Sequence, residues 1–110
     1  MNIYDTANKL AQEIKTSDEY LKFKEAKKSL ESNNELKQKV DNFEKMRYEV
    51  QVLAMQGKEV EEEKNKKLQE MYSILIAEKE IKEYFDLEVK FNVMLADVNK
   101  IIAESVKDVL

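Results

Sequence analysis

The stretch Leu53–Val60, with the sequence LAMQGKEV, contains the only glycine of a 110-residue chain that has no proline. Glycine adopts positive φ angles readily and is the usual residue just beyond the end of a helix. Gly57 also comes soon after a strongly apolar run, VQVLAM, at residues 50–55. We therefore predict that one helix ends here, that Gly57 is its C′ residue, and that a second helix follows.

The composition of the chain suits long helices. Hydrophobic residues make up 43% of it and charged residues 38%. A sandwich or barrel needs many turns, and a chain with one glycine and no proline has few residues to make them. The length allows one domain at most. We predict a single all-α domain over residues 1–110.

Two shorter helices are indicated before the central part of the chain. The first has one apolar face, formed by Ile3, Ala7, Leu10, Ala11 and Ile14. It should end near Lys15, because Thr16 and Glu19 have the spacing of a capping box that starts a second helix. The apolar face of that second helix consists of Tyr20, Phe23, Ala26 and Leu30.

A third helix follows a second capping signal. Ser32 stands three residues before Glu35, and Asn33 and Asn34 are alternative caps. The helix carries a heptad seam formed by Leu36, Val40, Phe43, Arg47, Val50 and Ala54. A charge on such a seam costs stability unless it is paired. Two interpretations of Arg47 stay open: it snorkels toward an acid of a neighbouring helix or the bundle edge, or it recognises a partner.

The C-terminal part of the third helix is apolar well beyond this seam. The residues that widen it are Met46, Tyr48, Val52, Leu53 and Met55. A helix apolar on so many sides must be covered on more than one side. We predict that Tyr48, Val52, Leu53 and Met55 belong to an interface with a second chain or a partner.

The acidic run Glu61–Glu63 opens a fourth helix, whose apolar face consists of Leu68, Met71, Tyr72, Leu75 and Ile76. A fifth helix is predicted from about Glu80 to Lys107, and whether it is continuous with the fourth is left open. Its main apolar stripe consists of Tyr84, Leu87, Phe91, Met94, Val98 and Ile101. A second stripe, formed by Phe85, Val89, Val93 and Ala96, lies to the other side. Its members Phe85, Val89 and Val93 are predicted to form an interface.

These helices predict an elongated bundle built on a long antiparallel hairpin. The third helix forms one arm and the fourth-to-fifth helices form the other, with the turn at Gly57. The two N-terminal helices pack on one end or flank of the hairpin. One chain has too few helices to cover both the widened apolar side of the third helix and the second stripe of the fifth helix. We therefore predict self-association as a homodimer.

Charge and residue chemistry limit the functions that this chain can have. The net charge is −4, and of the 19 basic residues only Arg47 is arginine, so nucleic-acid binding is not expected. The absence of cysteine and histidine removes the commonest nucleophile–base pairs and metal ligands. We predict no catalytic residues, no metal and no cofactor, and we interpret the acidic run EVEEEKNKK as a helix start and a solvated face.

The second helix contains the most basic stretch, KFKEAKK at residues 22–28. Its lysines are predicted to be solvated surface, and an RNA-associated accessory role through them is the alternative function. The N-terminus has no basic start followed by a continuous apolar core, and no window holds about 18 apolar residues. We therefore expect a cytoplasmic location and no membrane contact.

Several fragments of the chain, in their order and spacing, resemble one protein family. They are NIYDTANKLAQEI, SDEYLKFKEAKKSL, VDNFEKM, MQGKEV and IKEYFDLEVKFNVMLADVNKII. The chain resembles the YlbF/YmcA-like family of small helical proteins from Gram-positive bacteria, most closely its YheA-type branch. The resemblance covers nearly the whole sequence.

The resemblance implies an all-α, often oligomeric protein with no known catalytic activity. Better-studied relatives are regulatory partners that form a complex with a third protein. That complex influences competence, sporulation and biofilm formation and assists ribonuclease Y in messenger RNA processing. Some relatives hold iron–sulfur clusters through cysteines, a property that a chain without cysteine cannot share. We predict a non-enzymatic regulatory protein that acts through protein–protein contacts.

Overall fold

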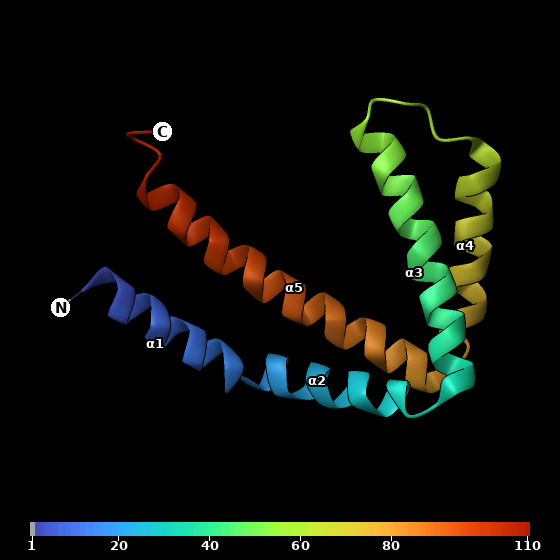
Figure 1. The fold of residues 1–110 in the computed structure, drawn as a ribbon, viewed down its shortest axis with the longest axis horizontal. Helices are drawn as coiled ribbons and strands as arrows, with labels where there is room; N and C mark the ends of the chain where they lie inside the picture. Colours follow the sequence, from blue (N-terminus) through green and yellow to red (C-terminus); the bar gives the residue numbers. More distant parts are fainter. Residues whose placement is uncertain (1) are drawn as a thin grey trace. The chain divides into compact units, whose positions relative to one another are not determined.

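The computed structural model of the chain describes residues 2–110 and consists of five α-helices. Their bounds are α1 Ile3–Lys15, α2 Asp18–Glu31, α3 Asn34–Met55, α4 Glu62–Ile76 and α5 Lys79–Ser105 (Figure 1). No strand occurs in this described part of the chain. The prediction of an all-α fold is confirmed.

The boundary between α1 and α2 lies one residue away from the predicted cap. The backbone N–H of Tyr20 donates to Ser17 Oγ over 3.2 Å, so Ser17 caps α2. Thr16 instead ends α1, and its hydroxyl donates to the carbonyl oxygen of Gln12 over 2.9 Å. The prediction that Thr16 caps the second helix is wrong, because α2 begins at Asp18 and Ser17 is the residue directly before it.

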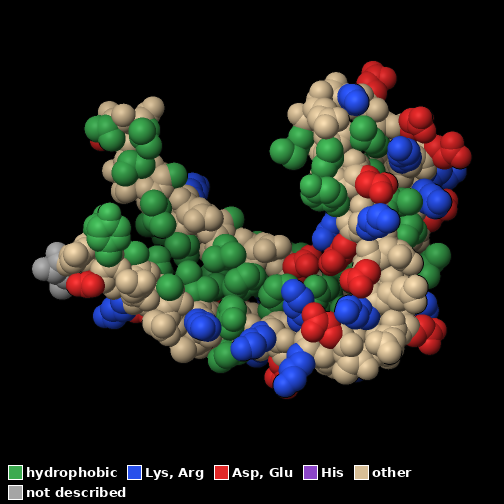
Figure 2. Space-filling model, in the orientation of Figure 1, with side chains coloured by type: hydrophobic (Ala, Val, Ile, Leu, Met, Phe, Trp, Pro, Cys, Tyr) green, Lys and Arg blue, Asp and Glu red, His purple; other side chains and the backbone are tan. Residues whose placement is uncertain are grey.

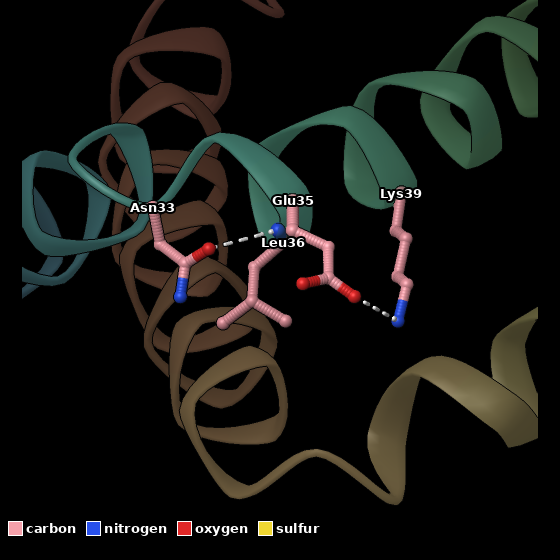
Figure 3. A network of polar contacts seen from close by, with 4 residues as sticks. All are labelled: Asn33, Glu35, Leu36 and Lys39. Atoms are coloured by element: carbon pink, nitrogen blue, oxygen red, sulfur yellow. Dashed lines mark hydrogen bonds and ion pairs between the residues drawn. The ribbon is translucent and has the colours of Figure 1, made fainter.

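The start of α3 is fixed by Asn33, one of the alternative caps. Its side-chain oxygen accepts from the backbone N–H of Leu36 over 3.2 Å, which satisfies one of the free donors of the first turn (Figure 3). Glu35 lies in the same turn and reaches Lys39, with 3.6 Å between the carboxylate and ammonium groups. The sequence signal at residues 32–35 is therefore a true helix start, with the cap one residue after Ser32.

Gly57 ends α3 as predicted. Its φ angle is +73°, and every other described residue avoids positive φ. The backbone N–H of Gly57 donates to Ala54 and that of Lys58 donates to Leu53, each over 3.1 Å. This pair of bonds is a Schellman motif, which satisfies two of the last carbonyls of the helix.

The chain divides into two compact units. The central unit, Lys28–Glu83, contains α3 and α4 as an antiparallel pair (Figure 1). The rings of Phe43 on α3 and Tyr72 on α4 lie 5.8 Å apart between centroids. The buried hydrophobic residues of this unit are Leu30, Leu36, Val40, Phe43, Leu75 and Ile81. The predicted hairpin at Gly57 is thus present for α3 and α4.

The second arm of the hairpin does not continue into α5. The chain turns at Ala77 and Glu78, where the backbone N–H of Glu78 donates to Leu75 over 3.0 Å. The new helix begins at Lys79. This turn uses ordinary negative φ angles, so it requires neither glycine nor proline. The predicted arm formed by the fourth and fifth helices is therefore interrupted at this turn. No glycine or proline marks the turn in the sequence, because its negative φ angles are open to other residues.

The terminal unit consists of Met1–Lys27 and Tyr84–Leu110, so it contains α1, most of α2 and most of α5. Phe23 on α2 lies 5.5 Å from both Tyr84 and Phe91 on α5, measured between ring centroids. Tyr20 adds a further ring contact with Phe91 at 6.0 Å. Hydrophobic side chains gather along the border between α2 and α5 (Figure 2). This aromatic cluster is what joins the N-terminal segment to α5.

Candidate interaction surfaces

One side of α5 is apolar and open to solvent. Val89, Val93 and Ile101 are 59%, 53% and 70% exposed, respectively. Together with Lys90, Met94, Asp97 and Val98 they line a groove of about 500 Å³ that Glu19 of α2 borders. We call the residues Val89, Lys90, Val93, Met94, Asp97, Val98 and Ile101 the α5 face. Single exposed apolar residues are ordinary, but several of them on one side of a helix are typical of an interface.

Phe85 was predicted to share this surface, but the structure places its side chain in the interior. It is 4% exposed, and its ring lies 5.7 Å from that of Tyr84. Phe85, Val89 and Val93 do follow one another at helical spacing. Periodicity gives the side of a helix on which a residue lies, but not how far along the helix its neighbours cover that side. Phe85 is therefore a core residue of this chain, and only Val89 and Val93 lie on the α5 face.

The predicted residues of α3 are open to different degrees. Tyr48 is 67% exposed and Met55 is 87% exposed, whereas Val52 and Leu53 are half-buried. Tyr48, Val52 and Met55 are separated by four and three residues, so they follow one side of the helix. Leu53 lies on another side of the helix, about 100° from Val52. We call Tyr48, Val52 and Met55 the α3 patch. It covers the last two turns before Gly57.

The sequence did not indicate several members of the α5 face as interface residues. Ile101 was assigned to the main apolar stripe of the fifth helix, and Lys90 and Asp97 were not singled out. A signal was available, because Val89, Val93, Asp97 and Ile101 recur at intervals of four residues. Such a run drifts slowly around a helix and follows one side of it. Because the charged Asp97 interrupts this run, the sequence does not show a purely apolar stripe there.

Arg47 lies beside two residues of its own helix. Its guanidinium is 3.9 Å from the carboxylate of Glu44, one turn earlier, and 5.5 Å from the ring centroid of Phe43. The side chain of Arg47 is 39% exposed and that of Glu44 is 35% exposed. Its aliphatic stem can thus remain against apolar neighbours while the charge reaches water and an acid. The contact with Glu44 is compatible with the snorkelling interpretation, and both interpretations of Arg47 stay predictions.

The acidic run at residues 59–67 forms a helix start. Glu62 and Glu63 lie in the first turn of α4, where carboxylates interact favourably with the helix dipole. Within residues 2–110, no three acidic, histidine or cysteine side chains are grouped so that they could hold a metal ion. None of the helices in this range combines the length and the apolar character that crossing a membrane requires.

The lysines of α2 are all at the surface. Lys22, Lys24, Lys27 and Lys28 are exposed, and the ammonium of Lys24 lies 6.0 Å from the ring centroid of Tyr20. The exposed Glu25 stands among them and dilutes the positive charge. The RNA-associated role through these lysines stays a prediction.

Comparison with known proteins assigns this arrangement of five helices to a class of small bacterial proteins. Residues 3–107 match the family model described as "Control of competence regulator ComK, YlbF/YmcA". The chain therefore belongs to the YlbF/YmcA family, and the predicted resemblance is confirmed at that level.

Individual relatives match over most of their own length. A UPF0342 protein of Caldicellulosiruptor saccharolyticus is 40% identical over 105 residues, which are 96% of this chain and 88% of the relative. A UPF0342 protein of Bacillus cytotoxicus is 34% identical over 107 residues, which are 97% of this chain and 92% of the relative.

A solved structure also resembles the chain. It is a protein of unknown function, DUF964, from Bacillus stearothermophilus, with a TM-score of 0.85 and coverage of 96% of this chain and 93% of that chain. At 15% identity this similarity shows the fold alone.

Proposed function

We propose that this chain is a non-enzymatic regulatory protein that acts through protein–protein contacts. The observation that carries the proposal is the exposure of apolar side chains on two helices, at Val89, Val93 and Ile101 on α5 and at Tyr48 and Met55 on α3. Burying such residues against another protein removes apolar surface from water, at about 25 cal/mol per Å². An enzyme would instead need converging polar groups in a concave site.

The proposal includes self-association as a homodimer and a second contact with a regulatory partner. Two apolar surfaces support two kinds of contact, since the α3 patch and the α5 face lie on different helices and in different units. We place the chain in the YheA-type branch of its family and in the cytoplasm. Membership of the YlbF/YmcA family supports a regulatory role with partners in competence control. The family resemblance adds ribonuclease Y-dependent processing of messenger RNA as a second setting for such partners.

The partner contact is tested by affinity purification from the bacterial host. The three baits are the tagged wild type, a Tyr48→Glu, Met55→Glu double variant, and Ile74→Glu. Ile74 is 69% exposed on α4, so it offers the same chemical change outside both surfaces. A protein captured by the wild type and by Ile74→Glu, but not by the double variant, supports the proposal. Equal capture by all three baits contradicts it.

The RNA-associated alternative differs from this proposal in its response to salt. Contacts between lysines and phosphates weaken steeply as salt is added, whereas an apolar contact persists. Titration of labelled single-stranded RNA at low and high salt, with Lys24→Glu and Lys28→Glu as variants, separates the two. RNA binding that is lost on charge reversal would favour the alternative, and no binding at low salt would remove it.

A further inference from the structure

We propose that the α5 face is complementary to itself and that a second copy of the chain lies on it with its α5 antiparallel, so that Lys90 faces the partner's Asp97. This inference rests on the self-association in the proposed function and specifies its surface, direction and register. A two-fold axis makes each contact occur twice, since residue i meets residue j and residue j meets residue i. The α5 face has the residue pattern that such an axis requires.

The groove residues of α5 are arranged symmetrically about a point between Val93 and Met94. Reversing the helix about this point exchanges one half of the face with the other. The exchanged pairs are Val89 with Val98, Lys90 with Asp97, and Val93 with Met94. Apolar residues therefore meet apolar residues, and the positive charge meets the negative one. Ile101 alone lies outside this set.

The two charges of the face have no ion-pair partner within residues 2–110. Neither Lys90 nor Asp97 forms an ion pair in this described part of the chain, and both are exposed. They are separated by seven residues, or roughly 10 Å along the helix, which exceeds the spacing of ordinary pairs on one helix. An antiparallel partner brings the two charges opposite each other twice. A parallel partner would place Lys90 against the partner's Lys90 and Asp97 against the partner's Asp97.

The apolar centre explains why the charges would matter. Val89 and Val93 are more than half exposed, and in this register they pack on the partner's Val98 and Met94. Such packing is non-directional and would allow several registers. Two flanking charge pairs select one register, because like charges placed opposite each other are destabilising. The hydrophobic centre thus provides attraction, and the charges specify direction.

A charge-exchange experiment tests the pairing. The dissociation constant of the dimer is measured by sedimentation for the wild type, Lys90→Asp, Asp97→Lys and the double variant. Each single reversal should raise the constant about tenfold or more, because it places two like-charge pairs in one interface. The double variant restores both pairs and should return the constant to near the wild-type value. Single reversals without effect, or a double variant weaker than both, would overturn the proposed register.

A crosslinking experiment tests the direction independently, and a chain without cysteine offers a clean background. Near the axis, a single Val93→Cys substitution places two thiols close enough for a disulfide. Val89→Cys leaves its two copies about 13 Å apart along the helix axes, beyond the reach of a disulfide. Under mild oxidation Val93→Cys should form a covalent dimer and Val89→Cys should not. Equal crosslinking of both contradicts an antiparallel pair.

These outcomes separate this inference from the proposed function. A monomeric wild type at micromolar concentration would contradict self-association itself, and this inference with it. A dimer that is insensitive to charge reversal, or that crosslinks at Val89, would overturn only the pairing on α5. Circular dichroism of each variant shows whether the helices are intact, which is expected because Lys90, Asp97, Val89 and Val93 are exposed.

Discussion

The ring of Phe23 on α2 lies 5.5 Å from the ring of Phe91 on α5, with an angle of 33° between their planes. This contact joins residues 68 positions apart in the sequence and, with Tyr20 and Tyr84, forms the aromatic cluster of the terminal unit. Tilted aromatic pairs at this distance contribute beyond their buried area. The α5 face is presented on the helix that this cluster holds.

Phe23→Ala should lower the free energy of unfolding by about 2 kcal/mol, somewhat less than for a fully buried phenylalanine, because Phe23 is half-buried. Urea denaturation followed by circular dichroism measures this change. Leu21→Ala is the matched control, since Leu21 lies on the same helix and is 49% exposed. Equal losses of stability for the two substitutions would show that the aromatic cluster does not hold α2 against α5.

Gly57→Ala should cost about 1 kcal/mol of stability through backbone strain alone. An added Cβ would meet nothing within 4 Å, so a steric clash does not contribute, but the φ of +73° remains unfavourable. Gly57→Asn should cost less than Gly57→Ala, because asparagine tolerates this conformation better. Thermal and urea unfolding of the two variants provide the comparison. A neutral Gly57→Ala would mean that α3 does not end in the Schellman motif.

Asn33→Ala should destabilise the chain by about 1 kcal/mol, because it removes the side-chain acceptor that caps α3. Ser32→Ala is the control at the neighbouring position. The Ser32 hydroxyl donates to the carbonyl oxygen of Ser29 over 2.6 Å and does not cap α3. Its loss should therefore cost less. A larger loss of stability for Ser32→Ala than for Asn33→Ala would indicate that Ser32 caps α3.

Arg47→Leu should preserve the helical fold. The ion pair with Glu44 is partly exposed and lies within one helix, so its loss should cost less than about 1 kcal/mol. The far-ultraviolet circular dichroism spectrum and the unfolding midpoint are the measurements. Outright loss of folding would show that Arg47 has a larger structural role than a snorkelling side chain.

The sequence was sufficient for features that depend on local chemistry. The helix start near Asn33 and the turn at Gly57 follow from side-chain caps and from positive φ, and both can be recognised within a few residues. The cap of α2 was predicted one residue too early, because both hydroxyls can cap and the residue at which α1 ends decides which of them precedes α2. The turn at Ala77 and Glu78 could not be recognised in the sequence, because its φ angles are negative and require no glycine.

The candidate surfaces were predictable only in part, because exposure depends on contacts between distant segments. Helical spacing correctly placed Val89 and Val93 on one side of α5, and the structure finds both exposed. The same spacing also selected Phe85, which is buried. The groove beside Glu19 exists only once α2 lies against α5, through the long-range contacts of Phe23 with Tyr84 and Phe91.

Self-association through the α5 face is tested most directly by the solution mass of the wild type and of Val93→Glu, measured by light scattering at micromolar concentration. Val93 is 53% exposed at the centre of the α5 face, so a carboxylate there should leave the fold intact but oppose burial against a second copy. A homodimer formed through the α5 face should give twice the 13.0 kDa chain mass for the wild type and a single chain mass for the variant. A wild-type mass of 13.0 kDa would contradict it.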